Sequence, residues 1–215
     1  MGSRSGGKEV RMGYDTFKRI FDIIFSFFWL IILSPVLLLV GVLIKFEDGG
    51  KVFYRGVRVG LNGKEFKTFK FRTMVMNAER IGGPSTSDDD PRITKIGKFI
   101  RKYKLDELPQ LIDVLRGTMS FVGPRPEVPS ETATYTEEEK KVFTVRPGIT
   151  DWASIEYHNE GEILKGEVDP HEAYREKIRP GKLRLQRKYV SERSLTTDIR
   201  ILATTLVTLA RTRGR

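Results

Sequence analysis

Two adjacent carboxylates, Asp106 and Glu107, are the residues of this chain best suited to carry out chemistry. Successive side chains of a helix point about 100° apart, so the two groups need not share one role. One could attack phosphorus while the other binds a cation or moves a proton. Both also offer the oxygen ligands that Mg²⁺ prefers. Taken alone, an acidic pair before Leu-Pro at a helix start is explained more simply as capping and dipole chemistry.

Cations in special backbone settings favour the chemical interpretation. Arg125 lies between Pro124 and Pro126, which restrict its backbone and suit a guanidinium held ready for a phosphate. Lys70 and Arg72 alternate with phenylalanines, so a strand would place both cations on one face. The positions expected to bind substrate are Lys70, Arg72, Arg101, Pro124, Arg125, Pro126 and Arg146.

Composition narrows the partners. The formal net charge of +10, from 38 Lys and Arg against 28 Asp and Glu, implies lipid headgroups, a phosphorylated substrate or nucleic acid. Beside an apolar segment the first two are favoured, and nucleic acid is not expected. The sequence has no cysteine, which excludes thiolate chemistry and disulfides. It also lacks the GxxxxGK[ST], GxGxxG and GxSxG patterns of nucleotide loops and hydrolase elbows.

One uncharged run, from Ile23 to Ile44, can reach into a membrane. A straight helix of this length would measure about 33 Å, enough to cross a hydrocarbon core of about 30 Å. Ser34-Pro35 interrupts the run near its middle, where proline removes a donor and favours a bend. Basic residues flank the run on both sides, whereas a spanning helix usually has them mainly on one. The pattern indicates a re-entrant helix broken at Ser34-Pro35, with a single kinked spanning helix as the alternative.

Local patterns outline the elements around these residues. Alternating apolar residues on both sides of Asn62-Gly63 predict a β-hairpin over 51–72. Helical spacing predicts a basic amphipathic helix over 93–104 and a second helix over 108–115. The other predictions are a loop over 81–92, an extended segment over 120–129, a short helix over 136–142 with Thr136 and Glu139 as capping box, a turn over 145–150, helical structure over 170–190 interrupted at Pro180-Gly181, and a helix capped by Thr197 or Asp198 that runs to Ala210.

These residues carry a resemblance to a known family. The run KLDELPQLIDVLRGTMSFVGPRP over 104–126 is highly specific. FKFRTM over 69–74, VRPGIT over 145–150 and the segment around Ser34-Pro35 support it. Over residues 14–210 the chain resembles the monotopic phosphoglycosyl transferases, the bacterial sugar transferases that begin glycan assembly on polyprenol phosphate.

The resemblance implies an α+β fold and a place in the cell. We expect a mostly helical monotopic membrane protein with a re-entrant helix, interfacial amphipathic helices and a small β-hairpin. It would lie at the cytoplasmic face of the bacterial inner membrane, in contact with membrane lipids. Residues 1–12 would be flexible or left over from cloning, 13–48 the membrane helix-break-helix, and 49–212 the catalytic domain.

A ping-pong reaction is also implied by the resemblance. Asp106 would attack the β-phosphate of a UDP-sugar, expel UMP and carry the phosphosugar until polyprenol phosphate, expected to be undecaprenyl phosphate, accepts it. Glu107 would bind Mg²⁺ together with Asp106 or accept a proton, two roles that the sequence does not separate. The phosphates would be held by Lys70, Arg101, Arg125 and Arg146.

Several questions stay open at this point. Where many relatives have a glycine after VRPGIT, this chain has Asp151-Trp152, so neither the sugar nor the glycan pathway can be transferred. A homodimer is neither indicated nor excluded. The rival interpretations are a single-pass membrane protein whose basic domain binds anionic lipid or nucleic acid without catalysis, and a structural membrane adaptor. Neither explains why an acidic pair, a proline-enclosed arginine and strand-borne cations occur together.

Overall fold

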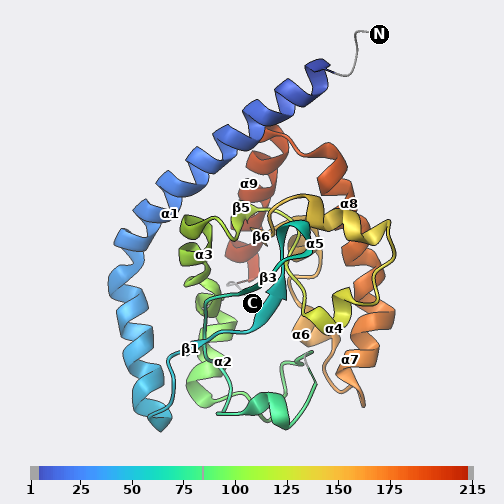
Figure 1. The fold of residues 1–215 in the computed structure, drawn as a ribbon. Coiled ribbons are helices and arrows are strands. Elements are labelled where there is room, and N and C mark those ends of the chain that lie inside the picture. Colours follow the sequence, from blue (N-terminus) through green and yellow to red (C-terminus); the bar gives the residue numbers. More distant parts are fainter. Residues whose placement is uncertain (1–4, 84, 213–215) are drawn as a thin grey trace.

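Helix α1 is the longest element of the computed structural model, which describes residues 5–83 and 85–212. It spans Ser5–Asp48, lies along one side of the molecule and changes direction partway along its length (Figure 1). Residues 1–12, predicted to be flexible, are helical from Ser5 onward. Residues 1–4 lie outside the described part of the chain.

The predicted break at Ser34-Pro35 is a bend within one continuous helix. Pro35 lies inside α1, and the Ser34 hydroxyl donates a hydrogen bond of 2.7 Å to the carbonyl of Ile31. A proline removes only its own donor, so the turns on either side can remain helical while the axis bends. Serine satisfies a nearby carbonyl at the same place.

The apolar side chains of α1 divide between an exposed face and a packed one. Leu38 and Phe46 are 70% and 86% exposed, whereas Val40 and Ile44 are buried against Phe71 of the domain. Within the described residues, α1 is the one helix long and apolar enough to cross a membrane. An exposed apolar surface of this extent is typical of an interaction site.

The predicted hairpin is confirmed as two short antiparallel ladders. Strand β2 pairs with β3 next to the turn, and β1 pairs with β4 farther from the turn. Asn62 and Gly63 both adopt the left-handed conformation, with φ of 57° and 72°, inside the connecting 3-10 turn. Asparagine and glycine tolerate this conformation, which explains the strong turn signal. The strands are β1 Phe53–Tyr54, β2 Val57–Val59, β3 Glu65–Lys67 and β4 Lys70–Phe71.

Another pair of strands is parallel. Strand β5, Ser120–Val122, pairs with β6, Gly148–Thr150. The predicted turn over 145–150 is therefore wrong in its second half. The strands approach so closely beside Gly148 that a Cβ there would lie 2.1 Å from the backbone nitrogen of Gly123. Only glycine fits, and the pairing depends on a distant partner that local patterns do not reveal.

Short helices make up most of the remaining chain. The predicted helices over 93–104 and 108–115 are confirmed as α2 and α3, and Thr94 caps α2. A 3-10 helix, Glu139–Thr144, replaces the predicted helix over 136–142. The bounds are α2 Lys95–Lys102, α3 Gln110–Arg116, α4 Pro129–Thr132, α5 Trp152–Glu156, α6 Glu160–Ile163, α7 Pro170–Ala173, α8 Arg179–Glu192 and α9 Leu195–Thr212, with further 3-10 turns over Ala78–Arg80 and Leu105–Glu107.

Two predicted helix boundaries are corrected near the C-terminus. The interruption expected at Pro180-Gly181 is a π-helical turn over Tyr174–Ile178, and Pro180 lies in the first turn of α8, where proline is tolerated. Helix α9 begins at Leu195, before the predicted caps, because the Ser194 hydroxyl accepts the backbone N–H of Thr197 at 3.2 Å.

Asp198 serves a different purpose, since it anchors α1 to the domain. Its carboxylate, 6% exposed, accepts hydrogen bonds from Tyr14 at 2.8 Å, Lys18 at 2.5 Å and Tyr189 at 2.9 Å. Tyr189 also packs in the core beside Val122 of β5. The start of α1 is thus tied to the same core that supports the parallel strands.

Candidate active site

The acidic pair lies in the 3-10 turn Leu105–Glu107 that links α2 to α3. Lys104 precedes this turn with a φ of 55°, a left-handed conformation that lets the chain reverse direction between the two helices. Asp106 is 3% exposed, and Glu107 is half-buried beside it. The turn therefore brings both carboxylates inside the domain, and they do not act as exposed helix caps.

Lys70 reaches the acidic pair from strand β4. Its amine lies 2.9 Å from Asp106 Oδ2 and 3.2 Å from Glu107 Oε1. Phe71, the next residue, is buried in the core and points to the opposite side of the strand. Asp113 of α3 accepts the backbone N–H of Phe69 at 2.7 Å. Phe69 and Phe71, the residues before and after Lys70, are thus both fixed, and this keeps the Lys70 amine beside the acidic pair.

Arg125 approaches Glu107 from the segment after β5. Its Nη1 donates to Glu107 Oε2 at 3.0 Å, and its Nη2 donates to Oε1. This two-pronged contact is the arrangement that guanidinium and carboxylate groups prefer. Burial would raise the pKa of Glu107, but the charges of Arg125 and Lys70 outweigh it and hold that pKa well below its usual range. Glu107 is therefore ionised and a weak base.

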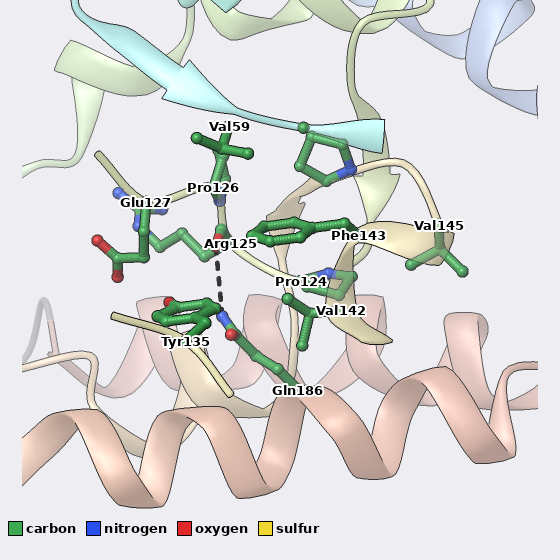
Figure 2. Close-up of a pocket in the computed structure, with 12 residues that line it drawn as sticks. Val59, Pro124, Arg125, Pro126, Glu127, Tyr135, Val142, Phe143, Val145 and Gln186 are labelled. Carbon is green, nitrogen blue, oxygen red and sulfur yellow. Dashed lines mark hydrogen bonds between the residues drawn. The ribbon is translucent and has the colours of Figure 1, made fainter. Parts of the chain in front are cut away.

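The backbone of Arg125 is held as firmly as its side chain. Its N–H donates to Asp151 at 3.2 Å. Figure 2 shows the second contact, in which the Arg125 carbonyl accepts from Gln186 at 3.4 Å. Pro124 and Pro126 line a small cavity of about 10 Å³ behind the segment and pack among apolar side chains there. The two prolines thus support the backbone of Arg125, and their predicted part in binding substrate stays a prediction.

One oxygen of the pair is left without a partner. Asp106 Oδ2 meets Lys70, whereas Oδ1 is buried and has no hydrogen-bond partner among the described residues. A buried carboxylate oxygen without a partner is costly and is a recognised sign of function. Both oxygens of Glu107 are taken by Arg125. Of the two carboxylates predicted to bind Mg²⁺, Asp106 is the one with a free oxygen.

Within the described residues, three other predicted substrate-binding residues form no ion pair with Asp106 or Glu107. Arg72 forms a two-pronged contact with Asp48, because strand β4 ends at Phe71 and the chain then turns toward the end of α1. Arg146 donates from Nε to the carbonyl of Gly117 at 3.0 Å. Arg101 lies in α2, and within the described residues its guanidinium has no hydrogen bond or ion pair. Of the predicted cations, the structure brings Lys70 and Arg125 together with the pair.

Sequence reasoning missed the residues that position these groups. Asp151 is fully buried, caps α5 through Ser154 and holds the backbone of Arg125. An aspartate directly before a short helical run is a capping signal that could have been read. Gln186 and Asp113 carry no such local signal, since their partners are distant in sequence.

Comparison with known proteins identifies the family of this chain. The family model described as bacterial sugar transferase matches residues 13–212. Exopolysaccharide production protein ExoY of Sinorhizobium fredii is 42% identical over 158 residues, which cover 66% of this chain and 70% of that protein. UDP-glucose:undecaprenyl-phosphate glucose-1-phosphate transferase of Escherichia coli is 36% identical over 193 residues, 88% of this chain but 39% of that protein.

A third relative is matched over a larger share of its own length. The putative undecaprenyl-phosphate N-acetylgalactosaminyl 1-phosphate transferase of Bacillus subtilis is 42% identical over 149 residues, 69% of this chain and 82% of that protein. The family match covers nearly the whole chain, including α1 and the acidic pair. The chain therefore belongs to the bacterial sugar transferase family and is an enzyme of the sugar phosphotransferase class.

Proposed function

We propose that this enzyme transfers a sugar 1-phosphate from a UDP-sugar to polyprenol phosphate, giving a polyprenol-diphosphate sugar and UMP. The family and the names of relatives that use undecaprenyl phosphate support this class of reaction. The observation that carries the mechanism is Asp106, whose Oδ1 is buried and unpaired while Oδ2 is held by Lys70. Such a carboxylate is oriented and lacks a partner, as a nucleophile should be.

In the first half-reaction, Asp106 Oδ1 attacks the β-phosphorus of the UDP-sugar. The bond from that phosphorus to the bridging oxygen breaks, UMP leaves, and the sugar phosphate remains as an acyl phosphate on Asp106. In the second half-reaction, a phosphate oxygen of polyprenol phosphate attacks the same phosphorus and releases the Asp106 carboxylate. Splitting the transfer in this way lets a water-soluble donor and a lipid acceptor use one site in turn.

Lys70 and Arg125 stabilise the charge that develops on the transferred phosphoryl group. Their positions are set before substrate arrives, because both are paired with Glu107. Preorganised cations stabilise a transition state without the cost of reorganisation. Glu107 thus acts by orienting the two cations, since a carboxylate with a strongly lowered pKa is a poor general base.

We also propose Mg²⁺ as the cofactor. Because Asp106 Oδ1 is the nucleophile, Asp106 would hold the ion through Oδ2, which Lys70 would have to release. Phosphate oxygens of the substrate would complete the site, since Mg²⁺ commonly binds one or two carboxylates together with phosphates. When bound, the ion offsets negative charge on the diphosphate. Glu107 joins the ligand set only if Arg125 or Lys70 releases one of its oxygens.

The location that we propose is the cytoplasmic face of the bacterial inner membrane, with α1 entering and leaving the same leaflet. The bend of α1 and the exposed apolar side chains such as Leu38 support this placement. Tags placed at the N-terminus and after Asp48 should both be accessible from the cytoplasm. Accessibility from opposite sides would establish a spanning helix and overturn the re-entrant topology.

The experiment that tests the mechanism is detection of the covalent intermediate. Donor-treated enzyme without polyprenol phosphate should carry one sugar phosphate on the peptide that contains Asp106, found by mass spectrometry. Asp106→Asn should give no adduct and no UMP. Asp90→Asn is the matched control, since Asp90 is also buried and paired with a cation, Arg92, but lies outside the pair. UMP release by Asp106→Asn at the wild-type rate would overturn the assignment.

A further inference from the structure

Two more carboxylates lie close to Arg125 besides Glu107. Glu127 follows it by two residues, and Glu160 begins helix α6. Their side chains are 20% and 32% exposed, so water screens them only in part. Attraction to Glu107 is the main cause that raises the pKa of Arg125, and Glu160 and Glu127 add to it. Three carboxylates thus attract one guanidinium, and only the contact with Glu107 serves the acidic pair.

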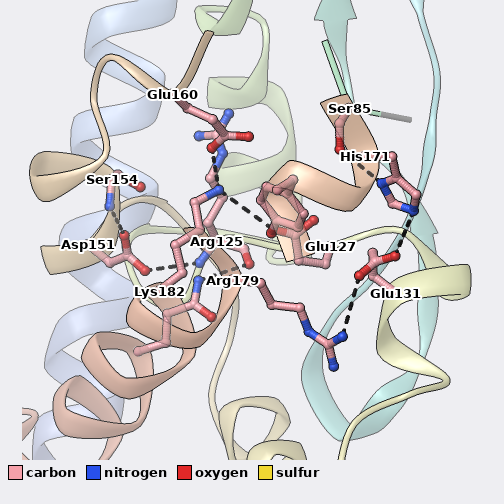
Figure 3. Close-up of polar contacts among 12 residues, drawn as sticks. Ser85, Arg125, Glu127, Glu131, Asp151, Ser154, Glu160, His171, Arg179 and Lys182 are labelled. Carbon is pink, nitrogen blue, oxygen red and sulfur yellow. Dashed lines mark hydrogen bonds and ion pairs between the residues drawn. The ribbon is translucent and has the colours of Figure 1, made fainter. Parts of the chain in front are cut away.

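Lys182 of helix α8 lies between the two additional carboxylates (Figure 3). Its amine is 2.5 Å from Glu160 Oε2 and 3.9 Å from Glu127 Oε1. Glu127 also accepts a hydrogen bond of 2.6 Å from the Tyr174 hydroxyl, and the Lys182 amine lies 4.9 Å from the centre of that ring. Lys182 is 5% exposed. The lysine charge is therefore buried among groups that compensate it.

Burying a lysine charge is costly unless the charge is paired and hydrogen-bonded. Here it neutralises the carboxylates that would otherwise compete with Glu107. The four carboxylates Asp106, Glu107, Glu127 and Glu160 are met by the three cations Lys70, Arg125 and Lys182. Removing Lys182 would leave Glu160 without its nearest cation, and Arg125 is the next guanidinium available to it.

We propose that Lys182 is a positioning residue for phosphosugar transfer, which keeps Arg125 directed at Glu107 by neutralising Glu160 and Glu127. The inference rests on the proposed function, because it assigns a task within that reaction to a residue outside the acidic pair. Without Lys182, Arg125 would turn toward Glu160, and Glu107 would lose its two-pronged contact with the guanidinium. Transition-state stabilisation would fall although every group of the pair is still present.

The first test measures UMP release by the full chain in membranes, with a UDP-sugar and polyprenol phosphate. Lys182→Met, which keeps the apolar stem, should lower kcat about tenfold or more with KM for the donor nearly unchanged. Lys182→Arg should retain the wild-type kcat. Lys182→Met/Glu160→Gln should recover kcat, because the competing carboxylate is gone.

Two results of this test would overturn the inference. One is a folded Lys182→Met variant with wild-type kcat. The other is a double variant no better than Lys182→Met, which would show that the charge of Glu160 is not the reason for the loss. A wild-type chain that releases no UMP from any UDP-sugar would count against the proposed function, and the second test then decides the inference by itself.

The second test needs no turnover. Glu107→Gln should lower the unfolding temperature of the wild-type chain, because it removes the carboxylate partner of Arg125. In the Lys182→Met background the same substitution should cost much less, since Arg125 has already turned to Glu160. Adding Glu160→Gln should restore the larger loss. Equal losses in the wild-type and Lys182→Met backgrounds would contradict the inference.

Discussion

Arg125 and Arg146 share a sequence signal but lie in different surroundings. Both are next to prolines, and both were expected to hold phosphate. Arg125 meets the carboxylate of Glu107 with both arms of its guanidinium. Arg146 instead donates to the carbonyl of Gly117, just after helix α3. A neighbouring proline restricts the backbone of an arginine, but it does not determine which group the guanidinium contacts.

The second region is a helix end capped by arginines. Arg19 of α1 donates to the carbonyls of Val114 and Leu115 at 2.6 and 2.8 Å, close to Arg146. These carbonyls are among those that a helix leaves unpaired at its C-terminus. Arg125 is held with Lys70 around Glu107, next to the unpaired oxygen of Asp106, whereas the cations bound to these carbonyls hold the scaffold. The first region is therefore suited to substrate, and the second to structure.

The sharpest test of this comparison replaces each arginine by glutamine. Arg125→Gln should lower kcat for UMP release about 10²–10³-fold, the usual cost of losing one preorganised donor to the transition state. Arg146→Gln should keep kcat within about threefold and lower stability by about 1 kcal/mol, the net value of one hydrogen bond. Steady-state kinetics and thermal unfolding measure both. Comparable losses of kcat in the two variants would erase the distinction.

The ion pair of Glu107 should also appear in the pH dependence of stability. Its pKa is lowered in the folded enzyme, so its stabilisation is present above the unfolded value of about 4.3 and is lost as pH falls through the folded value. Glu107→Gln should cost about 3–5 kcal/mol at pH 7. The difference from wild type should shrink progressively below about pH 4. Unfolding of both proteins at pH 7 and below about pH 4 checks this prediction. A difference in stability between wild type and Glu107→Gln that does not depend on pH would refute the ion-pair account.

Arg72 extends the comparison to a cation only two residues from Lys70. It joins Asp48 at the end of α1 to the carbonyl of Lys51, so its loss should loosen α1 from the domain. Arg72→Gln should cost about 2–3 kcal/mol of stability, within the range for hydrogen bonds to charged groups. UMP release per folded molecule should stay within about twofold. The stability of Arg72→Lys, which keeps the charge but not the two-pronged contact, should lie between those of the wild type and Arg72→Gln. A selective loss of kcat would instead place Arg72 at the substrate.

Local chemistry explains what the sequence could predict. The hairpin follows from Asn62-Gly63, two residues that accept the left-handed conformation of its turn. Helix α2 follows from its apolar spacing, and the hydrogen bonds of the Thr136–Glu139 capping box are present. Arg125 was singled out because two prolines restrict its backbone, and the acidic pair because two carboxylates are adjacent. Each of these features is decided within a few residues of chain.

Long-range partners explain what the sequence could not predict. Asp198 looked like a helix cap, but it anchors Lys18, which lies 180 residues earlier. Glu107 looked like a metal ligand of equal standing with Asp106, until Arg125 was seen to take both of its oxygens. Asp48 claims Arg72 in the same way from the end of α1. Which carboxylate claims which cation is settled by tertiary structure.

The smallest predicted effect concerns the capping box formed by Thr136 and Glu139. Thr136 accepts the backbone N–H of Glu139 at 3.3 Å, and Glu139 accepts that of Thr136 at 2.8 Å. Thr136→Ala removes the accepting hydroxyl and should cost about 1 kcal/mol, the typical value of an N-cap. The 3-10 helix that follows carries Phe143, which lines the small cavity behind Arg125. Since packing by the prolines and the contacts of Asp151 and Gln186 hold Arg125 independently of this cap, UMP release should be unchanged after correction for folded protein. Chemical denaturation and kinetics on the same sample test this, and a fall in kcat would mean that the cap helps to position the active-site arginine.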